Sequence, residues 1–381
     1  MNIFKAEPYR VHFIIGALLA ITGITPWLLF SMGLINSFPV VAHSRFLFFG
    51  FFMSFVSGFL MTAIPKMTSS FKASGFEIGI SVFTIAMMVV SILLGEDKIT
   101  LALVLVQFLL LIGFIGRRLS LKFIKNQNGL FFVPLGIFSG IIGTIILLFS
   151  DNFSAEVVAF GKLILYQGWL LNLLIGLGSR LIPMLSRKGS AILPIMGPDK
   201  ANKLFFVQAI ILNLSFPIEA FGVKELGLLI RAVVMTFVVV KNYRIFAPAV
   251  DTSFLARALT YSSIFLAAPY FLMVFFPENS IHLLHLVFIS GLALMTLLVA
   301  MRVTIAHGGE STDIEKQALM IPLSTVVIII ASLIRSFGVM IKPEHFNQWI
   351  LTSGLLWIFG SGLWLFYFGP KLWRTKGAST C

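Results

Sequence analysis

Twelve long apolar runs constrain this chain more than any other feature of its sequence. A helix needs about 20 apolar residues to cross the hydrocarbon core of a bilayer, and runs of that kind recur from end to end. We expect an all-α polytopic membrane protein in which residues 1–381 form a single integral membrane domain. The expected helices cover residues 11–31, 44–64, 77–95, 99–116, 130–150, 159–178, 203–221, 224–240, 255–276, 282–302, 317–340 and 346–368.

The composition excludes a soluble protein. Hydrophobic residues make up 58% of the chain and charged residues only 11%, whereas soluble domains carry roughly 25% charged residues. The single cysteine, Cys381, excludes a disulfide framework, a thiolate metal site and an iron–sulfur cluster. The N-terminal residues show no cleavage site of a signal peptide, so we expect 11–31 to be a retained helix.

The distribution of basic residues predicts the topology. With twelve spans, 21 of the 28 Lys and Arg residues fall on the side of the two termini, 5 fall on the other side, and Arg231 and Arg335 lie within spans. The positive-inside rule therefore places both termini in the cytoplasm. It also explains the net charge of +13, so we expect a lipid bilayer and no nucleic acid as a partner.

Two segments hint at internal repetition. GFLMTAIPKMTS (58–69) and GLGSRLIPMLSR (176–187) share a Gly and an Ile-Pro at the same distance, and they lie 118 residues, or four expected helices, apart. The expected helix 282–302 lies four helices further along. Three four-helix pseudo-repeats fit this spacing; the alternative is a chance coincidence of Gly and Pro near helix ends.

Four of the six histidines fall at the outer ends of expected helices: His43, His282, His285 and His345. Imidazole is the usual nitrogen ligand of haem iron, copper and zinc. His282 and His285 share one face of a helix, which suits two ligands, or one ligand and a side chain that orients it. The alternative is that histidines at helix ends are solvated and bind nothing, as we expect for His345 and for His12 on the cytoplasmic side.

Charged residues within the apolar runs call for partners. An arginine at the membrane centre costs roughly 2.5–3.5 kcal/mol, so Arg231 is expected to face the bundle and an anion. Arg335 is expected to extend to the outer surface, whereas Arg45 can do so or pair with a haem propionate. The acidic residues lie almost all in loops. Proton-coupled transporters usually bury a carboxylate in the membrane, so this distribution is evidence against that function. The chain has no HExxH, phosphate loop or Gly-x-Ser-x-Gly.

Four motifs carry a resemblance to a known family. They are EPYR (7–10), HSRFLFFGFFMSFVSGFLMTAIP (43–65), GSRLIPMLS (178–186) and HLVFISGLALMTLLVAMRVTIAHGG (285–309). In order and spacing they resemble the NnrS family of polytopic bacterial membrane proteins, described as containing haem and copper and associated with the response to nitric oxide. The His285–Arg302 and His285–His307 intervals also fit the family pattern.

One departure concerns copper. The family's second helix typically opens with His-Ala-His-Glu, and this chain keeps only the first histidine, as His43, with Arg45 and Phe46 at the positions of the second histidine and the acid. A fainter likeness of architecture is to the large subunit of haem-copper oxidases, which has twelve helices and a haem held by histidines on helices 2 and 10. The copper histidines of that subunit have no counterpart here.

The resemblance implies a haem protein of the bacterial cytoplasmic membrane that responds to nitric oxide. We expect non-covalent haem b near the outer face, between the second and tenth expected helices (44–64 and 282–302), with His43 and His285 as its ligands. His282 is expected as an alternative ligand or neighbour, and Arg45 as a propionate partner. A copper site is in doubt. Nitric oxide and a respiratory electron donor are the implied partners. The first alternative is a transporter of a small anionic solute, whose cytoplasmic-face site would include Arg10, Arg180, Arg302 and His307. The second is an assembly partner of a respiratory complex.

Overall fold

The computed structural model describes residues 7–119, 129–186, 188, 198–248, 253–308, 311 and 313–373. Cys381 lies outside this part of the chain. The described residues divide into two compact units, which are treated separately below: unit 1 comprises Met1–Glu96, Ser253–Ala258 and Phe288–Cys381, and unit 2 comprises Asp97–Thr252 and Leu259–Val287.

The all-α polytopic fold predicted from the sequence is confirmed. The described residues hold no strand, and ten of their helices are long and apolar enough to cross a membrane. The fifth and eighth expected spans are helical as well. The fifth is the shorter helix Phe132–Leu148, and the eighth, which begins at Lys224, carries Glu225, Arg231 and Lys241 along its length.

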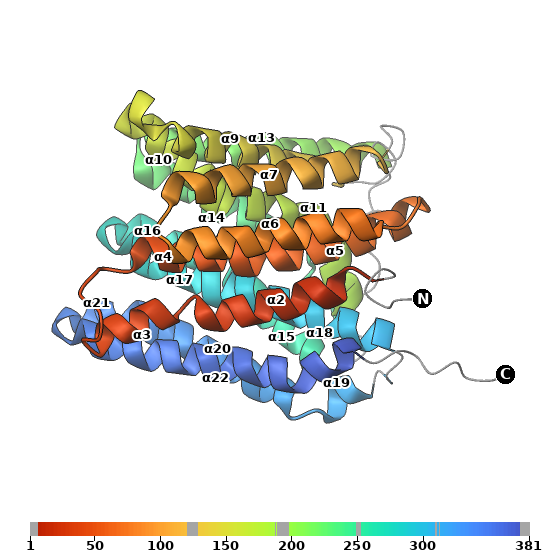
Figure 1. Ribbon diagram of the computed structural model, residues 1–381. Helices are drawn as coiled ribbons and strands as arrows, with labels where there is room; N and C mark the ends of the chain where they lie inside the picture. The colour runs from red at the N-terminus through yellow and green to blue at the C-terminus, as the bar shows by residue number, and fades with distance from the viewer. Residues whose placement is uncertain are drawn as a thin grey trace. The chain divides into compact units, whose positions relative to one another are not determined.

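Unit 1 contains the helices at the two ends of the chain. Their bounds are α2 (Tyr9–Thr22), α3 (Thr25–Ser31), α4 (Val40–Arg45), η1 (Phe46–Phe52), α5 (Met53–Thr68), α6 (Gly75–Leu93), α18 (Leu294–Gly308), α19 (Ile314–Gln317), α20 (Met320–Leu333), η7 (Ile334–Gly338), α21 (Val339–Ile341), η8 (Pro343–His345) and α22 (Phe346–Trp373). Figure 1 shows α2, in red, running alongside α22, in blue.

Small residues bring the helices of unit 1 into close contact. A Cβ atom at Gly58 of α5 would lie 2.6 Å from His12 Cβ and 3.0 Å from Tyr9 Cα, so this glycine lets α5 approach α2. Two indoles of α22 join it to its neighbours: Trp357 Nε1 donates to Ala20 O at 2.8 Å, and Trp364 Nε1 donates to Leu297 O at 3.1 Å. Apolar packing and buried hydrogen bonds therefore act together in this core.

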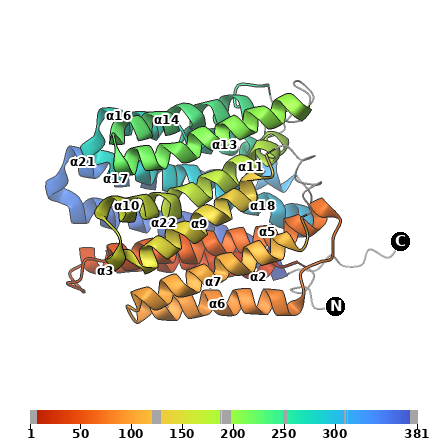
Figure 2. The same ribbon diagram turned by 90° about the horizontal axis from the view of Figure 1, so that it is seen from above.

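Unit 2 contains the middle helices of the chain. Their bounds are α7 (Asp97–Gly116), α9 (Phe132–Leu148), η2 (Ser150–Asn152), α10 (Ala155–Leu163), η3 (Ile164–Gly168), α11 (Trp169–Leu185), α13 (Pro198–Phe221), α14 (Lys224–Phe237), η4 (Val238–Asn242), α16 (Ala268–Phe275), η5 (Pro277–Asn279) and α17 (Ser280–His285). Figure 2 shows α13 lying beside α14. α15 (Phe254–Ile264) and η6 (Leu286–Ala293) each contribute residues to both units.

Five π-helical segments interrupt the described helices: η1, η3, η4, η6 and η7. η1 follows α4 directly, and η6 follows α17 directly, so His43 and His285 each lie within the last turn before a π-helical segment. π-Helical turns are rare and are found frequently at functional sites. These segments therefore mark the surroundings of both histidines for closer inspection.

Candidate functional site

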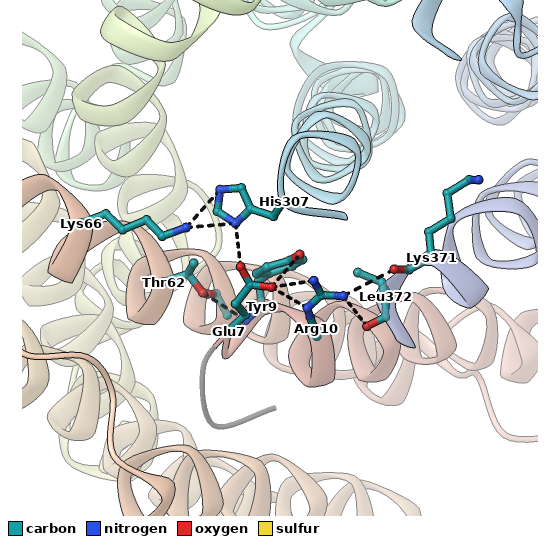
Figure 3. A network of polar contacts seen from close by, with 9 residues as sticks. Glu7, Tyr9, Arg10, Thr62, Lys66, His307, Lys371 and Leu372 are labelled. Carbon is teal, nitrogen blue, oxygen red and sulfur yellow. Dashed lines mark hydrogen bonds and ion pairs between the residues drawn. The ribbon is translucent and has the colours of Figure 1, made fainter. Parts of the chain in front are cut away.

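A polar network around the carboxylate of Glu7 in unit 1 joins four helices, α2, α5, α18 and α22 (Figure 3). Glu7 Oε2 accepts from Arg10 Nε at 2.6 Å and lies 2.6 Å from the terminal nitrogen Nη2 of the same guanidinium. The third guanidinium nitrogen of Arg10 donates to the backbone oxygen of Leu372 at 2.8 Å and approaches that of Lys371 at 3.4 Å. Arg10, which is buried, thus neutralises Glu7 and satisfies carbonyl groups near the C-terminal end of α22.

His307 is the second partner of Glu7. Its Nδ1 lies 3.4 Å from Glu7 Oε1, and its ring stands edge-on to the Tyr9 ring at 5.4 Å between centroids. Lys66 Nζ lies 3.1 Å from Nδ1 and 3.2 Å from Nε2 of His307. The imidazole is therefore held between an anion and a cation at the last turn of α18.

Glu7 remains ionised over the physiological pH range. Burial raises the pKa of its carboxyl group, but hydrogen bonds from His307 and Arg10, together with their charges, outweigh burial and lower the pKa to about 2. The network therefore contains an ionised carboxylate paired with a guanidinium, with a histidine and an ammonium group beside them.

The network unites parts of three motifs that are far apart in the sequence. Glu7, Tyr9 and Arg10 come from EPYR, Lys66 follows the Ile-Pro that ends the second motif, and His307 comes from the fourth. The start of α2 is also fixed here, because Thr62 Oγ1 of α5 accepts from the backbone N–H of Tyr9 at 3.1 Å, whereas Pro8 supplies no side-chain cap. Arg10 and His307 were predicted as site residues from the sequence, whereas Glu7 and Lys66 were not.

Two more residues were expected at the cytoplasmic face, Arg302 and Arg180. Arg302 pairs with Glu315, a buried carboxylate of α19 in unit 1. Arg180 belongs to α11 of unit 2, where its side chain is exposed.

His43 lies in unit 1, half-buried, with its ring fixed by the backbone. Its Nδ1 lies 2.9 Å from Gly23 O, and its ring stands edge-on to Trp27 at 6.2 Å between centroids. A carbonyl oxygen only accepts, so Nδ1 carries the proton, and the neutral ring then has its lone pair on Nε2. This is the state of a histidine that ligates a metal through Nε2.

His285 and His282 lie on α17 in unit 2, and both side chains are half-buried. His285 Nδ1 lies 2.7 Å from Ile281 O of its own helix. The same reasoning assigns the proton to Nδ1 and the lone pair to Nε2. His345 is exposed, in agreement with the expectation of a solvated helix end.

The expectation that His12 is solvated was wrong. Its side chain is fully buried, with Nδ1 at 3.0 Å from Pro8 O and Nε2 at 2.9 Å from Ser81 Oγ of α6. Gly58 leaves room for this imidazole between α2 and α5. Both ring nitrogens are thus hydrogen-bonded within the protein, which makes His12 a structural residue.

Arg231 faces the interior of unit 2, as its cost in a membrane predicts, and its anion is Glu219 of α13. The buried guanidinium also donates to Ser215 Oγ at 3.1 Å and to Gln167 Oε1 at 2.9 Å. Tyr270 donates to the same Gln167 oxygen at 2.8 Å. The acidic partner of Arg231 was not predicted from the sequence, because Glu219 lies near the end of an apolar run.

Among the described residues, no three His, Cys, Asp or Glu side chains gather as the ligands of a closed metal site do. A haem takes only one or two protein ligands. The lack of a group of three such side chains among the described residues therefore does not bear on haem binding.

Comparison with known proteins identifies the family. A family model described as NnrS protein matches residues 3–376, a range that contains all four motifs. No curated protein matches the chain. With nearly its whole length matched and three of its motifs gathered in one network, the chain belongs to the NnrS family.

Proposed function

We propose that this chain is an NnrS-like haem protein of the bacterial cytoplasmic membrane that serves the response to nitric oxide. His43 and His285 are the proposed axial ligands of a b-type haem. No Cys-x-x-Cys-His occurs in the sequence, so the haem is non-covalent.

The observation that carries the proposal most is the packing of helices 2 and 10 directly after the two histidines. Phe48 of η1 and Phe288 of η6, both in unit 1, meet edge to face at 4.9 Å between ring centroids. His43 precedes Phe48 by five residues, and His285 precedes Phe288 by three. This contact lies within unit 1, and it supports the choice of one haem ligand from each of these two helices.

The protonation state of both histidines fits haem ligation. Each Nδ1–H donates to a backbone carbonyl group, Gly23 O for His43 and Ile281 O for His285. Such a hydrogen bond orients the ring and leaves the Nε2 lone pair for a metal. Neither bond needs a side chain that haem binding would displace.

The surroundings of His43 also fit the anionic part of a haem. Arg45 is buried two residues along the chain, and Arg335 of η7 lies close enough to His43 to act on it electrostatically. Beside Arg335, the buried Ser336 Oγ has no hydrogen-bond partner among the described residues. Guanidinium groups pair well with carboxylates, so Arg45 and Arg335 are the proposed propionate partners.

When bound, the haem would supply an iron that exchanges one electron reversibly. The protein's part would be to hold the haem through His43 and His285. Ligation by two histidines would favour electron transfer or sensing, whereas ligation by a single histidine would allow the iron to bind nitric oxide. A respiratory electron donor is the proposed source of electrons.

A copper site of the kind implied by the family pattern does not fit this chain. Arg45 stands where the second histidine of the pattern would be, and a guanidinium is not a copper ligand. Phe46 replaces the acid. We therefore include no copper in the proposal.

The test is the dithionite-reduced minus oxidised spectrum of protein purified in mild detergent from haem-replete cells. Wild type should show the sharp reduced bands of six-coordinate b haem, and His43→Ala and His285→Ala should lose them or turn high-spin. His345→Ala, at an exposed histidine, is the matched control and should leave the spectrum unchanged. His282→Ala distinguishes a neighbour from a ligand, because only loss of a ligand changes the spin state.

A wild type that folds, elutes as a single species and is colourless would refute the haem proposal. A haem spectrum that survives unchanged in both His43→Ala and His285→Ala would refute the ligand assignment. The far-ultraviolet circular dichroism of each variant would show whether a lost haem reflects a lost ligand or a lost fold.

A further inference from the structure

We propose that Lys66 and His307 form a binding site for an oxyanion, at the end of unit 1 where the Glu7 network lies. Sulfate and the phosphate group of a lipid headgroup share the required chemistry. The site is separate from the proposed haem ligands and does not depend on them.

Among the described residues, the network has more positive charge than acceptors. Glu7 is the one carboxylate that they contribute to it, and Arg10 already occupies its Oε2. Lys66 Nζ has three donors, and its partner within this part of the chain is the His307 ring, which accepts through one nitrogen when neutral. Two donors of the exposed ammonium group can therefore bind an added acceptor.

Like charges surround Lys66. Lys72 and Arg10 act on Lys66 as like charges, and Glu7 is the one opposite charge among the described residues that acts on it. An oxyanion that bridges Lys66 and a protonated His307 would relieve this repulsion and accept a charge-assisted hydrogen bond from each.

The side chains of Lys66 and His307 are also positioned before any ligand binds. His307 is held by Tyr9 and Glu7, and Glu7 is held by the buried Arg10. Lys66 follows Pro65 in the last turns of α5, where Ser70 N–H donates to Pro65 O at 3.0 Å and closes the helix. A site whose side chains are already ordered loses less entropy on binding. The ordinary pattern of positive residues at a membrane surface does not require such fixed partners.

The experiment measures the thermal stability of the full chain in dodecyl maltoside over a sulfate titration, with sodium chloride keeping the ionic strength constant. A bound ligand stabilises the folded state by RT ln(1 + [L]/Kd), so the gain in stability begins near the dissociation constant and then rises with the logarithm of the sulfate concentration. We expect a gain of this form in wild type. Binding should be about tenfold to a hundredfold weaker in Lys66→Gln and His307→Gln, the loss expected for one charge-assisted hydrogen bond.

Two further variants keep the test decisive. Lys371→Gln removes a cation of α22 outside the Lys66–His307 pair and should respond as wild type does. Lys66→Arg keeps the charge and should retain the stabilisation by sulfate, so that a loss in Lys66→Gln is not mistaken for damage to the fold. Equal stabilisation by sulfate in wild type and Lys66→Gln, or no stabilisation of wild type by sulfate, would overturn the proposal.

Added phosphatidylglycerol separates the two sources of the anion. If the headgroup is the occupant, the lipid should stabilise wild type more than Lys66→Gln and abolish the sulfate response. If a free anion is the occupant, the sulfate response should persist in the presence of the lipid. A haem spectrum plays no part in either readout, so failure here leaves the haem proposal untouched.

Discussion

The ion pair between Arg231 and Glu219 offers the sharpest test of the energetics of unit 2. Glu219→Gln removes the negative charge and keeps the size of the side chain. Arg231 is 0% exposed and Glu219 13% exposed, so the variant leaves a buried guanidinium without its anion. Ser215 and Gln167 would continue to accept from it.

The expected loss follows from these contacts. Removing one partner of a buried pair costs about 3–5 kcal/mol. Two neutral acceptors remain here, and the guanidinium lies over the Phe216 and Tyr270 rings at 4.7 and 5.4 Å. We therefore expect a loss near the lower end, about 3 kcal/mol in the free energy of unfolding. Lys98 and Asp151 form a matched exposed pair in the same unit, 73% and 75% exposed, whose loss should cost about 0–1 kcal/mol.

The assay is equilibrium unfolding in mixed micelles of increasing dodecyl sulfate content, with Glu219→Gln and Asp151→Asn measured side by side. A double variant, Arg231→Met with Glu219→Leu, should be less damaging than Glu219→Gln alone, because it removes the buried charge together with its partner. If Glu219→Gln and Asp151→Asn unfold within about 0.5 kcal/mol of each other, burial of the Arg231 charge does not have the energetic role assigned to it.

Two further outcomes are expected. Burial raises the pKa of Glu7, but hydrogen bonds from His307 and Arg10 outweigh it and hold the pKa at about 2. The ionised carboxylate therefore stabilises the fold fully above its unfolded pKa of 4.5 and loses this effect as pH falls towards 2. Between pH 5 and pH 3, the free energy of unfolding should fall less steeply in Glu7→Gln than in wild type, and parallel curves for the two proteins would contradict the network. Gly58→Leu should destabilise unit 1 by about 1–3 kcal/mol, because a Cβ atom at this position meets His12 and Tyr9. Gly79→Leu should not destabilise it, because a Cβ atom there has open space. Equal melting temperatures for the two variants would contradict this packing.

The helices could be predicted because a bilayer leaves few alternatives for apolar runs. Backbone groups in hydrocarbon must pair within a helix, so each run of about 20 apolar residues had one outcome. The cost of a charge in hydrocarbon likewise predicted that Arg231 faces the interior. It did not identify Glu219 as the partner, because that contact joins two helices and depends on how α13 and α14 turn about their axes.

The polar sites were less predictable because their partners are far apart in the chain. His12 is buried by Ser81 and Gly58, which are 69 and 46 residues away, and no local pattern shows that these helices meet. His307 and Lys66 are 241 residues apart. The resemblance of motifs did carry a signal for this site, since Glu7, Lys66 and His307 lie in or beside the quoted motifs. A search for charged residues and histidines within those motifs would have found Glu7 and His307, and Lys66 directly follows the second motif.

The π-helical segments give the expected internal repeat a second line of support. Pro65 and Pro183 lie 118 residues apart, and η1 and η3 begin at Phe46 and Ile164, at the same interval. η6 begins at Leu286, 122 residues after η3, on the helix that lies four helices further along. A π-helical turn is rare, so three at nearly equal intervals are harder to attribute to chance than two prolines. The segments also differ in what they carry: His43 precedes η1 and His285 precedes η6, whereas η3 presents Gln167 to Arg231. If the three share an origin, two have kept histidines suited to a metal, and the third now supports a buried ion pair.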